Sequence, residues 1–272
     1  MLVPLAAVLA TLAACTAATT TTSMAAAPAT TTSAAAVTTA AAPTTTAGMS
    51  GELLVSAAAS LTDAFGEIEA GFEAEHPGVD VVLNLGASST LREQILEGAP
   101  ADVFASANTS TMDQVVEGGG AADYQIFVTN ILQIATPPDN PGGVTGLDDF
   151  AREELLIGLC EEQVPCGSFG REALANAGVT PSIDTSEPDV RALLTKVESG
   201  ELDAGIVYVT DVLSTDGGVL GVDIPAEYNV VAQYPIAVLT EAPNPAAAAA
   251  FVEYVLPSPG QVILSRYGFE SP

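Results

Sequence analysis

The sequence has few of the residues on which most catalytic and nucleic-acid-binding sites depend. Its 272 residues include one histidine, no tryptophan, three cysteines and six lysines and arginines, against 34 aspartates and glutamates. The resulting formal net charge of −28 argues against binding to nucleic acids or anionic membranes. A catalytic triad would need His76, which Glu75 and Pro77 place at the polar end of a helix. A secreted serine hydrolase that uses Ser88 is therefore an alternative without a suitable base.

Sequence motifs of catalytic sites are also missing. There is no P-loop, no G-x-G-x-x-G after a strand and no cluster with metal-ligand spacing. The stretch "GASST" at 86–90 lacks the second glycine of a nucleophile elbow. We therefore expect a protein that is not an enzyme and needs no cofactor.

Charged residues are absent from the first 50 positions. The opening apolar run is too short to span a bilayer and is typical of a signal peptide, expected over 1–15. It ends in "LAAC", which resembles the lipobox of bacterial lipoproteins, so Cys15 is the expected lipidation site. An Ala-rich segment with a chance cysteine is the alternative. Residues 16–50, rich in Thr, Ala and Pro, are expected to be a disordered tether outside the cytoplasmic membrane.

The other two cysteines, Cys160 and Cys166, form an even pair. In an exported protein such a pair predicts a disulfide. A metal-binding pair is the alternative, but the single histidine lies far away in the sequence.

From Gly51 on, strand-like and helix-like segments alternate. Strands are expected over 52–59, 79–86, 101–106, 157–160 and 203–213, and helices over 61–76, 89–98, 150–156, 167–178 and 187–200. This alternation predicts parallel strands with right-handed crossovers. The length of more than 200 residues predicts two lobes. No apolar run in this body is long enough to span a membrane.

Two serines occupy equivalent places in this pattern. Ser60 and Ser88 each follow a strand and precede a helix, 28 residues apart. Ligands bind at such strand ends in open α/β sheets, and helix N-termini offer unpaired N–H groups to anions. The small residues 57–59 and 86–87 would let a ligand approach the backbone. The alternative is that both serines are ordinary N-caps, with Ser60 and Asp63 forming a capping box.

Five stretches, in this order, resemble the periplasmic molybdate-binding proteins of ABC importers. They are "AAASLTDAF", "GASSTLREQILEGAPADVFASA", "VPCGSFGREAL", "DVRALLTKVESGELDAGIVYVTD" and "SRYGF". The resemblance extends from Glu52 to Phe269. It implies an α/β, two-lobed type II periplasmic-binding-protein fold, in which each lobe is a mixed, mostly parallel sheet flanked by helices and the ligand lies in the interlobe cleft. The expected lobes are 51–129 plus 236–272, and 130–235.

The resemblance also implies a set of residues that bind a tetrahedral oxyanion. Ser60 and Ser88 would donate from the first lobe. Cys166 and Val190 would donate backbone N–H groups from the second lobe, and Tyr208 its phenol hydroxyl. Without the resemblance, Tyr208 could equally be a plain core aromatic. Molybdenum would be held as molybdate, with no residue as a direct metal ligand, and the expected partners are a membrane permease and an ATPase.

Molybdate has only acceptor oxygens, so its site must supply donors and exclude carboxylates. None of the six fixed cations falls on a position that the resemblance assigns to the ligand. Tungstate has nearly the same size and charge and cannot be separated from molybdate by sequence. Sulfate and a ligandless surface adhesin are further alternatives. We expect a monomer, anchored by the lipid on Cys15 to the outer face of the cytoplasmic membrane.

Overall fold

The computed structural model describes residues 49–256 and 259–272. The predicted signal peptide, Cys15 and the tether up to residue 48 lie outside the described residues. The first element among the described residues is the strand that precedes Ser60.

The first lobe is built from alternating strands and helices. Strands β1 (Gly51–Ala58), β2 (Val79–Gly86) and β3 (Val103–Ala105) are parallel, with β1 between the other two. Helix α1 (Thr62–Glu75) connects β1 to β2, and α2 (Ser88–Leu96) follows β2. The face of α1 that carries Phe65, Ile68 and Phe72 is fully buried, as its apolar spacing predicts. Helix α3 (Thr109–Glu117) follows β3.

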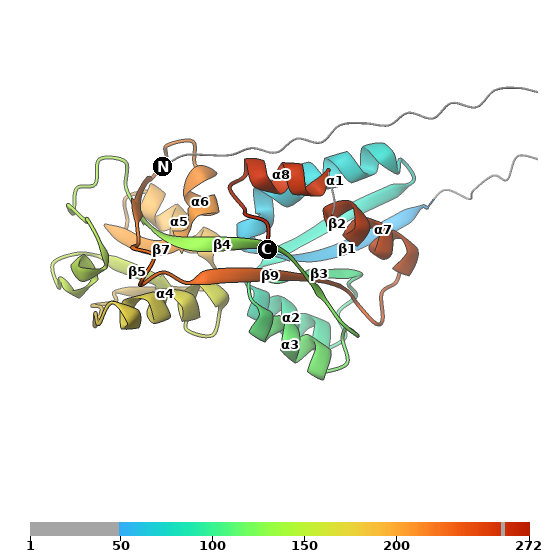
Figure 1. Ribbon diagram of the computed structural model, residues 1–272, viewed down its shortest axis with the longest axis horizontal. Coiled ribbons are helices and arrows are strands. Elements are labelled where there is room, and N and C mark those ends of the chain that lie inside the picture. Colours follow the sequence, from blue (N-terminus) through green and yellow to red (C-terminus); the bar gives the residue numbers. More distant parts are fainter. Residues whose placement is uncertain (1–48, 257–258) are drawn as a thin grey trace, which may run out of the picture. The chain divides into compact units, whose positions relative to one another are not determined.

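Two long antiparallel strands connect the lobes. Strand β4 (Gln125–Thr136) pairs with β9 (Val231–Val238) over its first part and with β7 (Ala204–Tyr208) over its second. Strand β9 also pairs with β3. The strand order is therefore β2-β1-β3-β9-β4-β7-β5-β6, where β5 is Ile157–Cys160 and β6 is Thr185–Glu187, and β8 (Leu220–Asp223) pairs with β4. Figure 1 shows β4 and β9 side by side between the two lobes.

The second lobe repeats the parallel arrangement. Strand β5 (Ile157–Cys160) lies between β6 (Thr185–Glu187) and β7 (Ala204–Tyr208), parallel to both. Helix α4 (Pro165–Asn176) follows β5, α5 (Val190–Glu198) follows β6, and α6 (Val209–Leu213) follows β7. The remaining elements are the 3-10 helices η1 (Ala59–Leu61) and η2 (Leu147–Ala151), strand β8 (Leu220–Asp223), and helices α7 (Pro245–Val255) and α8 (Gly260–Arg266).

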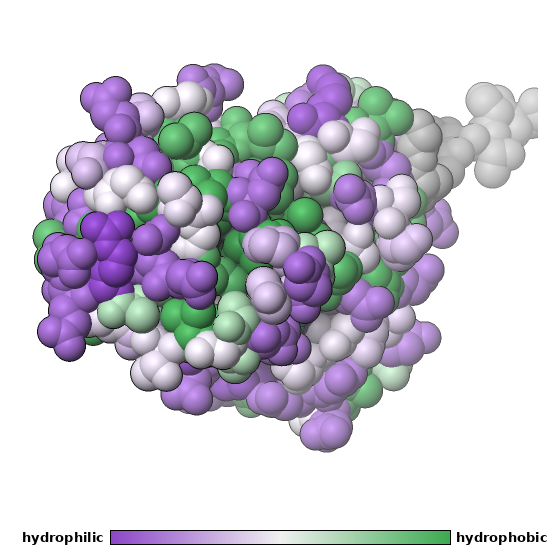
Figure 2. Space-filling view, turned by 60° about the vertical axis from the view of Figure 1, so that its left-hand side comes forward, coloured by the Kyte–Doolittle hydropathy of each residue, from purple (hydrophilic) through white to green (hydrophobic). Residues whose placement is uncertain are grey.

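Helices cover both faces of each lobe. In Figure 1, α1, α7 and α8 lie on one face of the first lobe and α2 and α3 on the other, while α5 and α6 lie opposite α4 in the second lobe. On the face seen in Figure 2, hydrophilic side chains dominate the edges and apolar ones gather nearer the middle. This is the expected two-lobed α/β fold. The boundaries at 129/130 and 235/236 remain a prediction.

Three expected elements in the second lobe differ from the structure. The segment 150–156 contains only the end of a 3-10 helix. A short strand, β6, precedes the helix expected over 187–200, which starts at Val190 because Asp189 accepts hydrogen bonds from two backbone N–H groups and caps it. The strand expected over 203–213 ends at Tyr208, where Asp211 accepts a hydrogen bond from the Tyr208 N–H and starts α6.

No single helix among the described residues is long and apolar enough to cross a membrane. The bent pair α7 and α8 meets the length and composition criteria together, with an angle of 55° between the helices. Phe251 and Val255 of α7 are fully buried, so the apolar face of this helix packs into the core.

Candidate functional site

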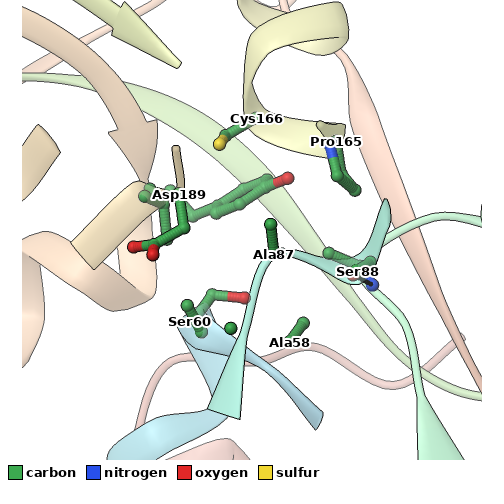
Figure 3. Close-up of a pocket in the computed structure, with 12 residues that line it drawn as sticks. Ala58, Ser60, Ala87, Ser88, Pro165, Cys166 and Asp189 are labelled. Carbon is green, nitrogen blue, oxygen red and sulfur yellow. Dashed lines mark hydrogen bonds between the residues drawn. The ribbon is translucent and has the colours of Figure 1, made fainter. Parts of the chain in front are cut away.

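A small cavity lies where the strands of both lobes end and their helices begin. Its volume is about 20 Å³, far below the roughly 300–1,000 Å³ of pockets for organic ligands. Figure 3 shows Ser60 and Ser88 on two neighbouring turns, facing Cys166 and Asp189 across the cavity. The lining residues are Ala58, Ala59, Ser60, Gly86, Ala87, Ser88, Ala107, Pro165, Cys166, Asp189, Val190 and Tyr208. All five residues expected to bind the ligand are therefore brought together, and each is at most 4% exposed.

Neither serine caps its helix. Ser60 lies in η1, and the N-cap of α1 is Leu61, which forms no side-chain cap. The Ser60 hydroxyl instead lies 2.8 Å from the Tyr234 hydroxyl. Ser88 is the first residue of α2, and its Oγ accepts a hydrogen bond of 3.0 Å from the Ala107 N–H. The N-cap alternative, including the capping box with Asp63, is wrong.

The Ser88 hydroxyl keeps its own proton available. A serine hydroxyl has one donor and two acceptor positions, and the Ala107 N–H occupies one acceptor. Ser60 can be arranged in the same way if the Tyr234 hydroxyl donates to it. Both serines can then donate their protons into the cavity.

Two backbone N–H groups complete the donors from the second lobe. Cys166 and Val190 lie in the first turns of α4 and α5, where backbone N–H groups have no partner within the helix. Within the described residues, neither N–H donates a hydrogen bond. A disulfide joins Cys166 to Cys160 at the end of β5. The disulfide uses the Cys166 side chain and leaves its N–H available.

Tyr208 contributes a hydroxyl group that has no partner. Its side chain is 1% exposed, and the hydroxyl forms no hydrogen bond within the described residues. Burial raises the pKa of Tyr208 well above its ordinary value, so the phenol stays protonated. A buried hydroxyl without a partner is costly. Because Tyr208 lines the cavity, a ligand with acceptor oxygens would supply the missing partner.

Asp211 positions Tyr208 and is itself fully buried. Its Oδ2 accepts a hydrogen bond of 3.0 Å from the Tyr208 N–H. Burial, opposed by the attraction of Arg191, raises the pKa of Asp211 to about 7. The folded protein therefore binds the Asp211 proton more tightly than the unfolded chain does.

This pKa predicts the direction in which stability depends on pH. Between pH 4 and 7 the unfolded chain releases the Asp211 proton while the folded protein retains it, so the free energy of unfolding falls as the pH rises. The total decrease in the free energy of unfolding is reached above pH 7 and amounts to at most about 4 kcal/mol. Denaturant titrations at pH 5 to 8 should show a smaller loss in Asp211→Asn than in the wild type. Asp123→Asn, which removes an exposed carboxyl group, serves as the control; parallel curves for all three proteins would contradict the prediction.

Among the described residues that line the cavity there is no fixed cation, since none of them is Lys, Arg or His. The N-termini of α2, α4 and α5 carry partial positive charge and meet at its wall. Contrary to the expectation that carboxylates are excluded, Asp189 also lines it. Its Oδ1 accepts 2.9 Å hydrogen bonds from the N–H groups of Arg191 and Ala192, which partly offset the charge.

Tyr234 is a residue of the site that the sequence did not predict. It lies on β9, fully buried, with its ring 6.0 Å from that of Tyr208 and its hydroxyl on Ser60. Burial raises the pKa of Tyr234, so it also stays protonated. It supports Ser60 without lining the cavity. No sequence signal marked it, because 174 residues separate it from Ser60.

The serine hydrolase alternative lacks its base in the structure. The His76 ring packs against that of Phe72 at the C-terminal end of α1, with centroids 4.5 Å apart and the rings tilted by 52°. Ser88 lies instead against Ala107. Within the described residues, no group of three or more His, Cys, Asp or Glu side chains could hold a metal ion.

Two α/β lobes connected by β4 and β9, with a small donor-lined cavity between them, define the class of two-lobed solute-binding proteins. Residues 53–270 match the family model of bacterial extracellular solute-binding proteins. The chain belongs to this family.

Comparisons with individual proteins support this family assignment. The chain is 40% identical to the molybdate-binding protein ModA of Mycobacterium tuberculosis over 221 residues, which cover 81% of this chain and 85% of that protein. The fold is similar to that of the periplasmic molybdate-binding protein of Azotobacter vinelandii, with a TM-score of 0.73, 20% identity and coverage of 81% and 99%. It is also similar to that of the sulfate-binding protein SubI of M. tuberculosis, with a TM-score of 0.74, 18% identity and coverage of 81% and 86%.

Proposed function

We propose that this protein captures molybdate outside the cytoplasm and delivers it to an ABC importer. The observation that carries the proposal is the small cavity of about 20 Å³, which Ser60, Ser88, Cys166, Val190 and Tyr208 line together. Its role is binding and release, without a chemical step.

The donors match the chemistry of a fully deprotonated tetrahedral oxyanion. Ser60, Ser88 and Tyr208 would each donate an O–H, and Cys166 and Val190 an N–H. Such an anion offers only acceptors, which these donors match. The Asp189 carboxylate at the wall accepts hydrogen bonds from the N–H groups of Arg191 and Ala192. Hydrogen bonds to a charged group are stronger than neutral ones, and the alanines keep water away from them. A fixed cation is therefore not required.

Tungstate would bind in the same way, because its size and charge are nearly those of molybdate. Sulfate is the second candidate, favoured by the small volume of the cavity. A smaller tetrahedron would leave part of the donor set out of reach, so we expect weaker binding of sulfate.

The proposal includes the place of the protein in transport. As an extracellular solute-binding protein it acts outside the cytoplasm, with a membrane permease and an ATPase as its partners. We further propose that it works as a monomer, anchored by lipid on Cys15 and connected through the tether over 16–50. In this arrangement the acidic surface would remain solvated while the loaded body reaches the permease.

A thermal-shift titration of the full-length chain with molybdate, tungstate, sulfate and phosphate tests the proposal. A ligand at 100 times its dissociation constant stabilises the folded state by about 2.7 kcal/mol, which raises Tm by about 5–10 °C for a chain of this size. We expect this rise with molybdate and tungstate. A rise with sulfate or phosphate alone would replace the proposed substrate, and no rise with any of the four would contradict oxyanion binding.

A further inference from the structure

Arg191 connects the two lobes beside the cavity. It follows Val190 at the start of α5, and its Nη2 forms an ion pair with Asp63 on α1, three residues after Ser60. Its Nη1 donates a hydrogen bond of 3.0 Å to the Ser214 hydroxyl at the end of α6. Among the ion pairs of residues 49–256 and 259–272, this pair alone joins the first lobe to the second.

The same guanidinium lies near a second carboxylate, in its own lobe, to which it forms no hydrogen bond. The Arg191 Nε lies 3.6 Å from Oδ1 of Asp211, beyond hydrogen-bond distance. Both atoms are buried and have no hydrogen-bond partner in the part of the chain that the structure describes. A small movement of the Arg191 side chain would join them. Arg191 therefore has two alternative carboxylates, Asp63 in the other lobe and Asp211 in its own.

We propose that Arg191 is an interlobe latch, which pairs with Asp63 when the lobes close and moves to Asp211 when they separate. The inference rests on the proposed function in one respect, that closure encloses an oxyanion. Neither Arg191 nor Asp63 lines the cavity. Both are positioning residues, which hold the lobes together without touching the ligand.

The latch has a specific kinetic effect. It stabilises the closed form, so its loss accelerates release of the anion. The Arg191 and Asp63 side chains are 27% and 40% exposed, and half-exposed ion pairs contribute up to about 1 kcal/mol, or a fivefold change in rate. Arg191 has the second partner in its own lobe, so it does not become an unpaired charge when the lobes open.

Asp63→Asn is the variant that separates a latch from a simple charge effect. Removing a negative charge near an anion site would, through electrostatics alone, speed capture and slow release. Loss of a latch does the opposite to release. We would measure release of radiolabelled molybdate from the full-length chain into excess unlabelled molybdate. We expect about fivefold faster release from Asp63→Asn, whereas the charge effect alone predicts slower release.

The ion pair between Arg266 and Glu67 supplies a matched control. Glu67 also lies on α1, but its partner is on α8 in the same lobe. Glu67→Gln should leave release unchanged. Asp63→Asn and Arg191→Lys remove the same ion pair, so their effects should not add. Release from the double variant should therefore be no faster than release from whichever single variant releases molybdate faster. Release from Asp63→Asn that is as slow as, or slower than, from wild type would overturn the inference.

Scattering from the ligand-free protein keeps this inference distinct from the proposed function. Small-angle X-ray scattering without any oxyanion should give a larger radius of gyration for Asp63→Asn than for wild type and Glu67→Gln. If no oxyanion binds, the latch is still tested by this comparison of the ligand-free proteins. Equal radii of gyration would overturn it.

Discussion

Tyr208→Phe should lower the affinity for molybdate about 10- to 100-fold, the effect of losing a hydrogen bond to a charged group. The same change should leave the ligand-free protein as stable as the wild type or make it more stable. The reason is that the Tyr208 hydroxyl is buried without a partner among residues 49–256 and 259–272, so its removal breaks no hydrogen bond there. Calorimetric titration and denaturant unfolding measure the two effects separately.

Two further variants serve as a comparison and a control for this prediction. Ser88→Ala should reduce affinity similarly and also cost stability, because it removes the acceptor of the Ala107 N–H. Ser89→Ala changes the neighbouring residue of α2, which does not line the cavity, and should leave affinity unchanged. If Tyr208→Phe bound molybdate as tightly as the wild type, the phenol would not be part of the site.

Gly167→Ala should destabilise the protein by more than about 3 kcal/mol, because overpacking against atoms that cannot move aside lies at the upper end of such effects. An added Cβ would lie 1.7 Å from the backbone oxygen of Glu161 and 2.7 Å from that of Cys160. These are backbone atoms of the loop that the disulfide closes, so no side-chain rotation relieves the clash. Thermal and denaturant unfolding would measure the loss.

Gly170→Ala is the control for this substitution. It lies one turn later in α4, where the nearest atom to an added Cβ is 3.6 Å away on Ile206. Alanine is the better helix former, so stability should be unchanged or higher. Equal stability of Gly167→Ala and wild type would mean that α4 does not approach the Cys160–Cys166 loop this closely, and the assigned position of the Cys166 N–H would be wrong.

The first lobe followed from local patterns in the sequence. Apolar spacing located α1, and the alternation of strands with helices placed Ser60 and Ser88 at equivalent strand ends. The local N-cap alternative failed because a tertiary partner takes each hydroxyl: Tyr234 for Ser60 and the Ala107 N–H for Ser88.

The second half of the site required more than local patterns. Cys166, Val190 and Tyr208 were expected only from the resemblance to a family, because β4 and β9 must cross between the lobes before these residues can face Ser60. Contacts made by Tyr234 and by Arg191 span more than a hundred residues and left no sequence signal.

Capping residues account for two of the three differences in the second lobe. The segments expected over 187–200 and 203–213 each continue past a capping aspartate, Asp189 or Asp211. In the structure, each accepts backbone hydrogen bonds that start a helix. Both carboxylates therefore place a residue that lines the cavity, Val190 or Tyr208, at the boundary of an element.

Anomalous X-ray diffraction at the molybdenum edge, from crystals of the protein grown with molybdate, tests the central claim most directly. The claim predicts one strong molybdenum peak inside the cavity, with oxygens within hydrogen-bond distance of the hydroxyls of Ser60, Ser88 and Tyr208 and of the N–H groups of Cys166 and Val190. A peak elsewhere on the protein, or none in the cavity at saturating molybdate, would contradict it.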